Sequence, residues 1–275
     1  MARKTVAFDH LALGVESLSD GFPCLAGQLG GRWALGGDSG DFMTGQLAYR
    51  EDMRVELIAP SGAGGFMRRF LDKGGPRPHH LTFKVPSLEE ALEAVGELGV
   101  QSSNGRVDMP FWREAFLHPK VGGLGTLVQL VESDDEFIKE MSKNNVAPPD
   151  FPESAADQQG IAWVGVTAES LDRAERLLCD VLSGAITGHG AGWFRASWGT
   201  GHSIVVRSAG AQFGEPRLWQ DAAPFGVDHV MFGPDELPVA GADWIDLIAL
   251  EPSPAVNLRM WLASTTKSAG ATEPG

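Results

Sequence analysis

Apolar and polar residues alternate in a ten-residue phrase that occurs twice in the first third of the chain. Residues 9–18 read DHLALGVESL and residues 79–88 read HHLTFKVPSL, which aligns the two without a gap and places His10 on His80. Alternation with a period of two predicts half-buried β-strands. The repetition therefore predicts a duplicated unit that returns a histidine at one fixed strand position.

Each phrase is followed by a second apolar strand with one polar residue at its centre. Glu56 stands in RVELI and Gln129 stands in LVQLV. Residues two apart in a strand share a face, so Phe8 and Ala12 are expected beside His10, and a curled sheet brings the polar side chains into one cup. Two imidazoles, a carboxylate and an amide oxygen suit a divalent metal ion. The predicted metal ligands are His10, Glu56, His80 and Gln129.

The same phrase returns twice more in a weaker form. IAWVGVTAESL and DHVMFGPDEL align with it and place Trp163 and His229 at the histidine position. The other two template positions fall on about Val205 and on Asp246. Two potential ligands remain and two are replaced, so we expect the second half of the chain to have lost its metal.

Helical periodicity between the phrases completes the unit. Residues 89–100 and 171–184 place Leu and Ala on one face of a helix, whereas 19–31 is a poorer helix. The unit is therefore strand–helix–strand–strand. The last copy is cut short, because too few residues separate His229 from the strand around Asp246 to hold a helix and further strands. Other strands are expected at about 42–49, 53–59, 113–118, 126–132, 193–197, 202–207 and 243–250.

These units predict an α+β fold of paired βαββ modules that form cupped mixed β-sheets in two tandem domains, the second truncated. A polar, Pro-bearing stretch between them predicts a linker that follows a short helix. The expected boundaries are 1–133 for the metal-binding domain, 134–158 for the linker, 159–262 for the degenerate second domain and 263–275 for a disordered tail.

The composition narrows the class of partner. The chain has 275 residues and a formal net charge of −14, which argues against nucleic acid or an anionic membrane surface and leaves a small-molecule substrate. Two cysteines without a CxxC pair fit a cytoplasmic protein. Neither a signal peptide nor a transmembrane span is expected.

The paired modules, the DHLAL and HHLTF strands and the run FLHPK...GGLGTLVQLVE together resemble the vicinal oxygen chelate superfamily of glyoxalases, bleomycin resistance proteins and dioxygenases. Within it, residues 1–133 are most similar to methylmalonyl-CoA epimerases. The resemblance places the metal ligands on the same four residues. It also implies that two ligands have exchanged positions, because the epimerases carry an amide at the position of Glu56 and a glutamate at the position of Gln129. The side chain of Gln129, unlike that glutamate, cannot titrate.

This resemblance and the ligand set imply a metal-dependent isomerase, epimerase or lyase that acts through a metal-stabilised enolate. The expected substrate is a small 2-oxo, 2-hydroxy or 2-acyl compound, with a CoA thioester as one alternative. The proton-transfer candidates are Glu56 and Asp41, which lies roughly where the epimerases keep a further carboxylate. One divalent ion is expected, and the ligand set does not distinguish Co, Ni, Mn, Zn and Fe.

Four residues around the closing strands of the first domain are candidates for substrate binding. They are Trp112, Arg113, His118 and Lys120. Each has a plain structural alternative in packing or in a strand-end turn. The basic run RRFLDKGGPR is either a solvated helix end or a contact to an acyl-CoA phosphate, and His79 is expected to point to the face opposite His80.

Two rival functions stay open. An Fe(II) extradiol-type dioxygenase would carry its ligands in the second domain, where only His229 and Asp246 remain. A metal-free binding or resistance protein would use the polar residues as pocket lining. Under any of these functions, a second domain that has lost its metal is expected to bury the open sheet edge of the first, to shape the cup or to form a homodimer face. A cavity lined by its aromatic residues is an alternative, and these are Trp163, Trp193, Phe194, Trp198, Trp219 and Trp244.

Overall fold

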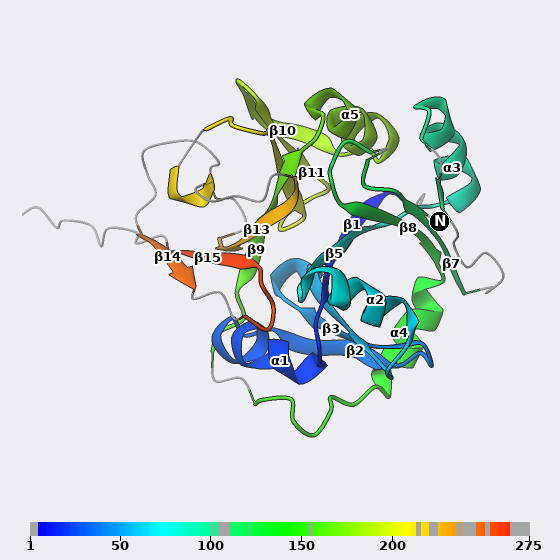
Figure 1. Ribbon diagram of the computed structural model, residues 1–275, viewed down its shortest axis with the longest axis vertical. Helices are drawn as coiled ribbons and strands as arrows, with labels where there is room; N and C mark the ends of the chain where they lie inside the picture. Colours follow the sequence, from blue (N-terminus) through cyan, green and yellow to red (C-terminus); the bar gives the residue numbers. More distant parts are fainter. Residues whose placement is uncertain are drawn as a thin grey trace, which may run out of the picture.

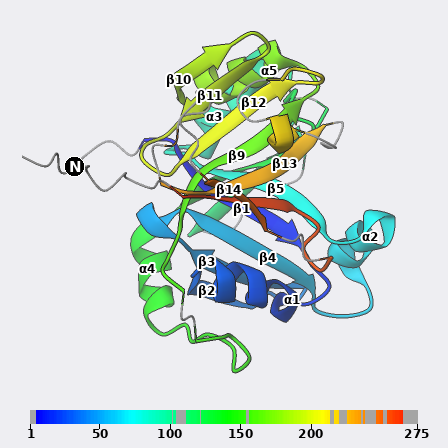
Figure 2. The same ribbon diagram turned by 90° about the vertical axis from the view of Figure 1, so that its left-hand side faces the viewer.

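The computed structural model describes residues 5–100, 102–103, 111–120, 122–153, 156–212, 216–219, 225–234, 237, 246–250 and 254–264. They form an eight-stranded and a seven-stranded mixed sheet with helices, which confirms the predicted α+β class (Figure 1). Figure 2 shows the strands β9–β13 stacked above β1–β4. Within these ranges, no helix is long and apolar enough to cross a membrane.

The first sheet has the strand order β2-β3-β4-β1-β5-β8-β7-β6. Its centre is the antiparallel pair β1 and β5, which carry the two copies of the repeated phrase. Each central strand has a parallel neighbour that carries a polar residue, β4 beside β1 and β8 beside β5. The strands are β1 (Ala7–Gly14), β2 (Arg32–Asp38), β3 (Phe42–Ala48), β4 (Arg54–Pro60), β5 (Arg77–Lys84), β6 (Ser102–Ser103), β7 (Trp112–Leu117) and β8 (Leu127–Ser133).

The second sheet repeats this order as β10-β11-β12-β9-β13-β15-β14. The strand around Asp246 is not the last of the truncated module, because β15 follows it and lies parallel to β13 as β8 lies to β5. The expected tail therefore begins too early, since β15 ends at Ser264, and residues 265–275 lie outside the described residues. The strands are β9 (Gly160–Ala168), β10 (Ala185–Gly190), β11 (Trp193–Ser197), β12 (Ser203–Ser208), β13 (Gly226–Gly233), β14 (Asp246–Leu250) and β15 (Arg259–Ser264).

A β-bulge marks each of the four repeated strands. The antiparallel pairing skips one residue immediately before each template position, and the skipped residues are Asp9, His79, Ala162 and Asp228. A bulge shifts every residue before it to the other face of the strand. Phe8 therefore does not share a face with His10 as expected, and packs against Phe83 in the core at a ring-centroid distance of 5.2 Å.

The helices of the repeated units cover the sheet faces away from the cup. Helix α1 (Leu18–Phe22) continues as the π-helix η1 (Pro23–Gln28), α3 spans Leu88–Glu97, and α5 (Leu171–Glu175) continues as η3 (Arg176–Val181). Their apolar side chains join one core that extends through both sheets. Two short 3-10 helices, η2 (Arg50–Asp52) and η4 (Pro216–Trp219), complete the connections.

The aromatic residues of the second sheet that the structure describes take part in packing. Trp163 is fully buried and shares a smaller buried cluster with Trp193, whereas Phe194 is buried in the large core. Trp198 reaches the first sheet and packs on Phe83 at 5.0 Å between ring centroids. Trp244 and the side chain of Trp219 lie outside what the structure describes.

Two further helices flank the open side of the first sheet, α2 (Gly65–Gly74) and α4 (Asp135–Lys143), which lie at opposite sides of its lower half in Figure 2. Helix α4 belongs to the expected linker. Asp134 caps its first turn, and after the helix Asn145 accepts hydrogen bonds from Trp33 Nε1 at 2.7 Å and Gly36 N at 3.1 Å. The linker therefore crosses the cup from the end of β8 to β2, to which Asn145 is hydrogen-bonded.

Candidate metal centre

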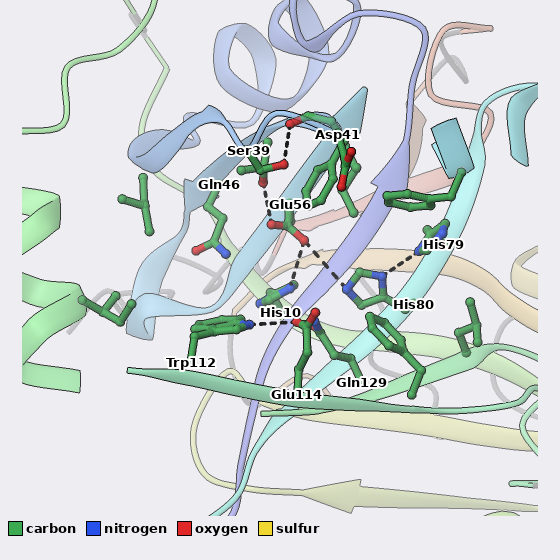
Figure 3. A pocket seen from close by; sticks show the side chains of 18 of the residues that line it. His10, Ser39, Asp41, Gln46, Glu56, His79, His80, Trp112, Glu114 and Gln129 are labelled. Atoms are coloured by element: carbon green, nitrogen blue, oxygen red, sulfur yellow. Dashed lines mark hydrogen bonds and ion pairs between the residues drawn. The ribbon is translucent and has the colours of Figure 1, made fainter. Parts of the chain in front are cut away.

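Side chains from three strands converge on the concave face of the first sheet. Register explains the meeting, because Ala12 of β1 pairs with Glu56 of β4 on one side and with His80 of β5 on the other. Glu56 Oε2 lies 3.2 Å from His10 Nε2 and 3.8 Å from His80 Nε2 (Figure 3). Taken together, one ligand atom from each of these three residues lies within 4.8 Å of the other two.

The geometry fits a divalent ion. Two ligand atoms at right angles on one ion, each ~2.1 Å from it, lie ~3 Å apart. His80 Nε2 is buried and has no hydrogen-bond partner in the part of the chain that the structure describes. An unsatisfied buried polar atom costs about 1–3 kcal/mol, and a bound cation would remove that cost. The three residues therefore form a donor set that could hold a divalent ion.

Neighbouring residues orient both imidazoles. Asp9 Oδ2 lies 2.7 Å from His10 Nδ1, which leaves Nε2 facing Glu56. The Nδ1 atoms of His79 and His80 share a hydrogen bond of 2.7 Å. His79 was expected on the opposite face, and this prediction is wrong, because the residue skipped by the bulge lies at the cavity. Such supporting contacts fix which nitrogen a histidine offers to a metal.

Burial and ion pairing together shift the pKa values of the residues in the cluster. Burial opposes protonation of His10, but Glu56 and Asp9 outweigh it and raise the pKa of His10 to about 9. Burial likewise opposes ionisation of Glu56, and His10, His80 and a hydrogen bond from Thr44 outweigh it, which lowers the pKa of Glu56 to about 2. Burial and the neighbouring His79 hold the pKa of His80 well below its usual value.

Gln129, the fourth predicted ligand, lies beside this cluster. It pairs with Thr82 across β8 and β5, and its Oε1 accepts a hydrogen bond of 2.7 Å from Thr82 Oγ1. Thr82 Oγ1 lies 2.8 Å from His10 Nε2, so the amide oxygen is on the cluster side. Gln129 Nε2 donates to Glu114 Oε2 at 2.7 Å.

The cluster forms the floor of a cavity of about 750 Å³. The wall is mostly apolar, and α2 and α4 contribute Phe66, Ile138 and Met141 to it. Asp41, on the loop between β2 and β3, is exposed and lines the same cavity from the side opposite Gln129 (Figure 3). A volume of this size suits a small organic ligand.

Of the four predicted substrate-binding residues, the structure brings only Trp112 to the cavity. Strand alternation explains the difference, since Trp112 and Glu114 face inward while Arg113 pairs with Glu89 and Glu132 outside. His118 is exposed at the strand end, where its Nδ1 accepts a hydrogen bond from the backbone N–H of Lys120.

Sequence reasoning missed Glu114 and the cavity residues of α4. Glu114 could have been found from alternation, since it follows Trp112 by two residues, but the strand was expected to begin at residue 113 and so to exclude Trp112. Ile138 and Met141 had no comparable signal, because they lie in a segment that reads as a polar linker. Only its docking against β2 through Asn145 places them at the cavity.

The second sheet holds no equivalent cluster among the residues described. By register, Trp163 and His229 take the histidine positions and Val205 takes that of Glu56. Trp163 Nε1 donates to His229 Nε2 at 3.2 Å. The assignment of Asp246 to the fourth position is wrong, because it begins the edge strand β14 and the position beside Met231 belongs to Trp261.

Comparisons with known proteins identify the class of the first domain. Residues 9–116 match the family model described as the Glyoxalase/Bleomycin resistance protein/Dioxygenase superfamily. The chain therefore carries a domain of this superfamily, as the repeated phrases predicted, and its two sheets are consistent with two tandem domains of the vicinal oxygen chelate type. A search of curated proteins finds no match.

Solved structures similar to this chain include a hypothetical protein from Bacillus halodurans C-125, with 28% identity over 48% of this chain and 96% of that one and a TM-score of 0.44. The methylmalonyl-CoA epimerase from Mycobacterium tuberculosis is 25% identical over 50% of this chain and 96% of that one, with a TM-score of 0.44. A Streptomyces coelicolor methylmalonyl-CoA epimerase in complex with 2-nitronate-propionyl-CoA is 20% identical over 47% and 99%, with a TM-score of 0.42.

Proposed function

We propose that this protein is a metal-dependent isomerase, epimerase or lyase that acts on a small 2-oxo, 2-hydroxy or 2-acyl compound. The observation that carries the proposal is the convergence of His10, Glu56 and His80 at the floor of the cavity, with His80 Nε2 buried and without a hydrogen-bond partner among the described residues. Gln129 is the proposed fourth ligand. The donor set and the superfamily domain support the same chemistry.

A divalent ion bound there would supply Lewis-acid polarisation of two oxygens on neighbouring substrate carbons. The residues of the chain hold the donors in place. Thr44 donates a hydrogen bond of 2.6 Å to Glu56 Oε1, while Glu56 Oε2 faces the two imidazoles. The apolar walls exclude water from the reacting carbons, which strengthens every charge interaction at the floor.

Proton transfer at the substrate carbon is assigned to a carboxylate of the cavity, Asp41 or Glu56. Asp41 is exposed at the cavity wall, so it can exchange its proton with solvent between turnovers. Glu56 is held at both oxygens by Thr44 and the histidines, which suits a ligand better than a mobile base. We therefore place Asp41 first in this role.

A CoA thioester is the finer alternative for the substrate. A smaller groove shares Phe66 and His79 with the main cavity and carries the cations Arg69, Lys73 and Arg77. Arg77 is engaged by the carbonyls of Phe70 and Gly75, whereas Arg69 and Lys73 are exposed on α2. Their charge and their place beside the cavity support contact with the phosphates of such a tail.

The first test is metal content per chain of protein purified without chelator. We expect about one divalent ion in the wild type and in His118→Ala, a control at an exposed histidine, and none in His80→Ala. If the wild type contains no metal and takes up none on titration, the enzyme proposal is contradicted, and a metal-free binding protein becomes the favoured class. Deuterium exchange into 2-acyl-CoA and 2-hydroxyketone substrates would then test the reaction. The exchange rates of Asp41→Asn and Glu56→Gln would be compared with the rate of the wild type.

One observation favours a second candidate. Two histidines and one carboxylate form the ligand triad of non-haem Fe(II) oxygenases, and His10, Glu56 and His80 match it in residue type. An extradiol-type dioxygenase would therefore use the first sheet and not the second. Oxygen uptake by the Fe(II)-loaded protein in the presence of a catechol distinguishes the dioxygenase from the isomerase, since an isomerase consumes no oxygen.

A further inference from the structure

The amide of Gln129 lies between two groups with different hydrogen-bonding capacity. On one side is the hydroxyl of Thr82, which lies 2.8 Å from His10 Nε2. On the other side is the carboxylate of Glu114, 2.7 Å from the amide nitrogen. An amide presents an oxygen at one end and an NH₂ group at the other, so its neighbours decide which end faces the metal cluster.

An ionised carboxylate can only accept hydrogen bonds. Glu114 therefore binds the NH₂ end of Gln129 and rejects its oxygen end, which would bring two lone pairs together. The amide oxygen is left on the side of Thr82 and the His10–Glu56–His80 cluster. Metal ions in proteins bind amide oxygens and not amide NH₂ groups, so this orientation is the one a ligand needs.

Glu114 is itself fixed from a second direction. Trp112 Nε1 donates a hydrogen bond of 2.8 Å to the same oxygen, Oε2, that accepts from Gln129 (Figure 3). Trp112 and Glu114 both lie on the cavity face of β7, next to β8. A chain of hydrogen bonds therefore runs from the cavity wall through Glu114 and Gln129 to Thr82.

We propose that Glu114 is a positioning residue that holds the Gln129 amide with its oxygen toward the metal cluster. The inference rests on the proposed function in giving Gln129 a ligand role, and on the hydrogen bonds alone in fixing the orientation of the amide. It explains how a chain with glutamine at this position can still offer an oxygen ligand there. It also assigns Glu114 a role that depends on the position of its carboxylate oxygen, which accepts hydrogen bonds from Gln129 and Trp112.

Two substitutions separate geometry from charge. Glu114→Leu removes the acceptor and the charge, whereas Glu114→Gln removes the charge and keeps an oxygen that can accept from Gln129 and Trp112. Isothermal titration with Zn²⁺ or Co²⁺ should show affinity about 10–100-fold weaker in Glu114→Leu, the usual effect of losing an outer contact of a ligand. Glu114→Gln should stay within about 3-fold of the wild type. Equal losses in both variants, or no loss in Glu114→Leu, would overturn the inference.

A metal-free measurement tests the orientation independently. Gln129→Glu brings a carboxylate against Glu114, so we expect the melting temperature of the metal-free protein to fall by about 2–6 °C. Adding Glu114→Gln to Gln129→Glu restores a donor–acceptor pair and should recover most of that fall. A Gln129→Glu protein as stable as the wild type would mean that the amide does not donate to Glu114. If wild type binds no metal but this cycle behaves as expected, the proposed function fails and the orientation stands.

Discussion

Asp9 Oδ2 lies 2.7 Å from Nδ1 of His10, and the same carboxylate–imidazole pair recurs in the second sheet at Asp228 and His229. In both strands the aspartate is the residue skipped by the bulge. The pair therefore belongs to the repeated strand itself. Only in the first sheet does the far nitrogen of the histidine face a cluster of potential ligands among the described residues.

Asp9→Ala should weaken metal binding about 10–100-fold, because His10 loses the acceptor that directs its Nε2 to the cluster. The measurement is Zn²⁺ or Co²⁺ affinity by titration calorimetry. Asp228→Ala is the matched control, since it removes the same pair where no ligand cluster is described, and its metal affinity should equal that of the wild type. Unchanged affinity in Asp9→Ala would remove the orienting role.

Asp228→Ala should instead lower the free energy of unfolding by about 2–4 kcal/mol at pH 7, because it leaves the buried His229 and the guanidinium of Arg259 without their carboxylate. Burial alone would raise the pKa of Asp228, but His229 and Arg259 lower it below its usual value. A carboxyl with a lowered folded pKa stabilises fully above its unfolded pKa of about 3.9 and loses that contribution as the pH falls through the folded value. Urea unfolding at pH 7 and at pH 3 should show the difference from wild type shrinking with acid, and a constant difference would contradict this.

Trp163→Ala should destabilise the protein by about 3–5 kcal/mol, since Trp163 is fully buried and its removal leaves a cavity in the second sheet. Metal content should stay at that of the wild type. Trp112→Ala is the contrasting variant, because its side chain already faces the cavity, and it should cost less in chemical denaturation. If the Trp163→Ala variant is fully folded but has lost its metal, the second sheet contributes to the metal site.

Asn145→Ala should loosen helix α4 from the first sheet, because Asn145 makes three hydrogen bonds to Trp33 and Gly36. We expect a loss of about 1–3 kcal/mol and faster hydrogen exchange in residues 134–145. Asn144→Ala, at an exposed neighbouring side chain, is the control and should change neither. Unchanged exchange in Asn145→Ala would mean that other contacts hold the helix over the cavity.

Most strands of this protein could be predicted within a few residues from alternation. The segment expected at 42–49 is β3, and the one expected at 193–197 is β11, with the same bounds. Four strands were missed: β15, which lies inside the second sheet, the two-residue edge strand β6, and β2 and β10, which are Gly-bearing edge strands without a clear apolar period. Edge strands bury little on either face, so their sequences carry little pattern.

The bulges could not be predicted, and they decided several orientations in the site. One extra residue in a strand leaves the hydrophobic sequence almost unchanged while it reverses the faces on either side. Phe8 and His79 were therefore assigned to the wrong faces. Arg113 faces away from the cavity because alternation along β7 turns Trp112 and Glu114 inward, whereas His118 and Lys120 lie beyond the end of β7 at Leu117.

The sequence by itself determined the duplicated units, the α+β class and the superfamily to which residues 9–116 are matched, because repeated strand phrases record local periodicity and burial. It also singled out His10, Glu56, His80 and Gln129 as residues of one site. Only the tertiary structure decided that Glu114 contacts Gln129, that α4 closes the cavity and that β15 completes the second sheet. These features depend on register and docking between segments distant in the chain, and such contacts leave no periodic trace in either segment alone.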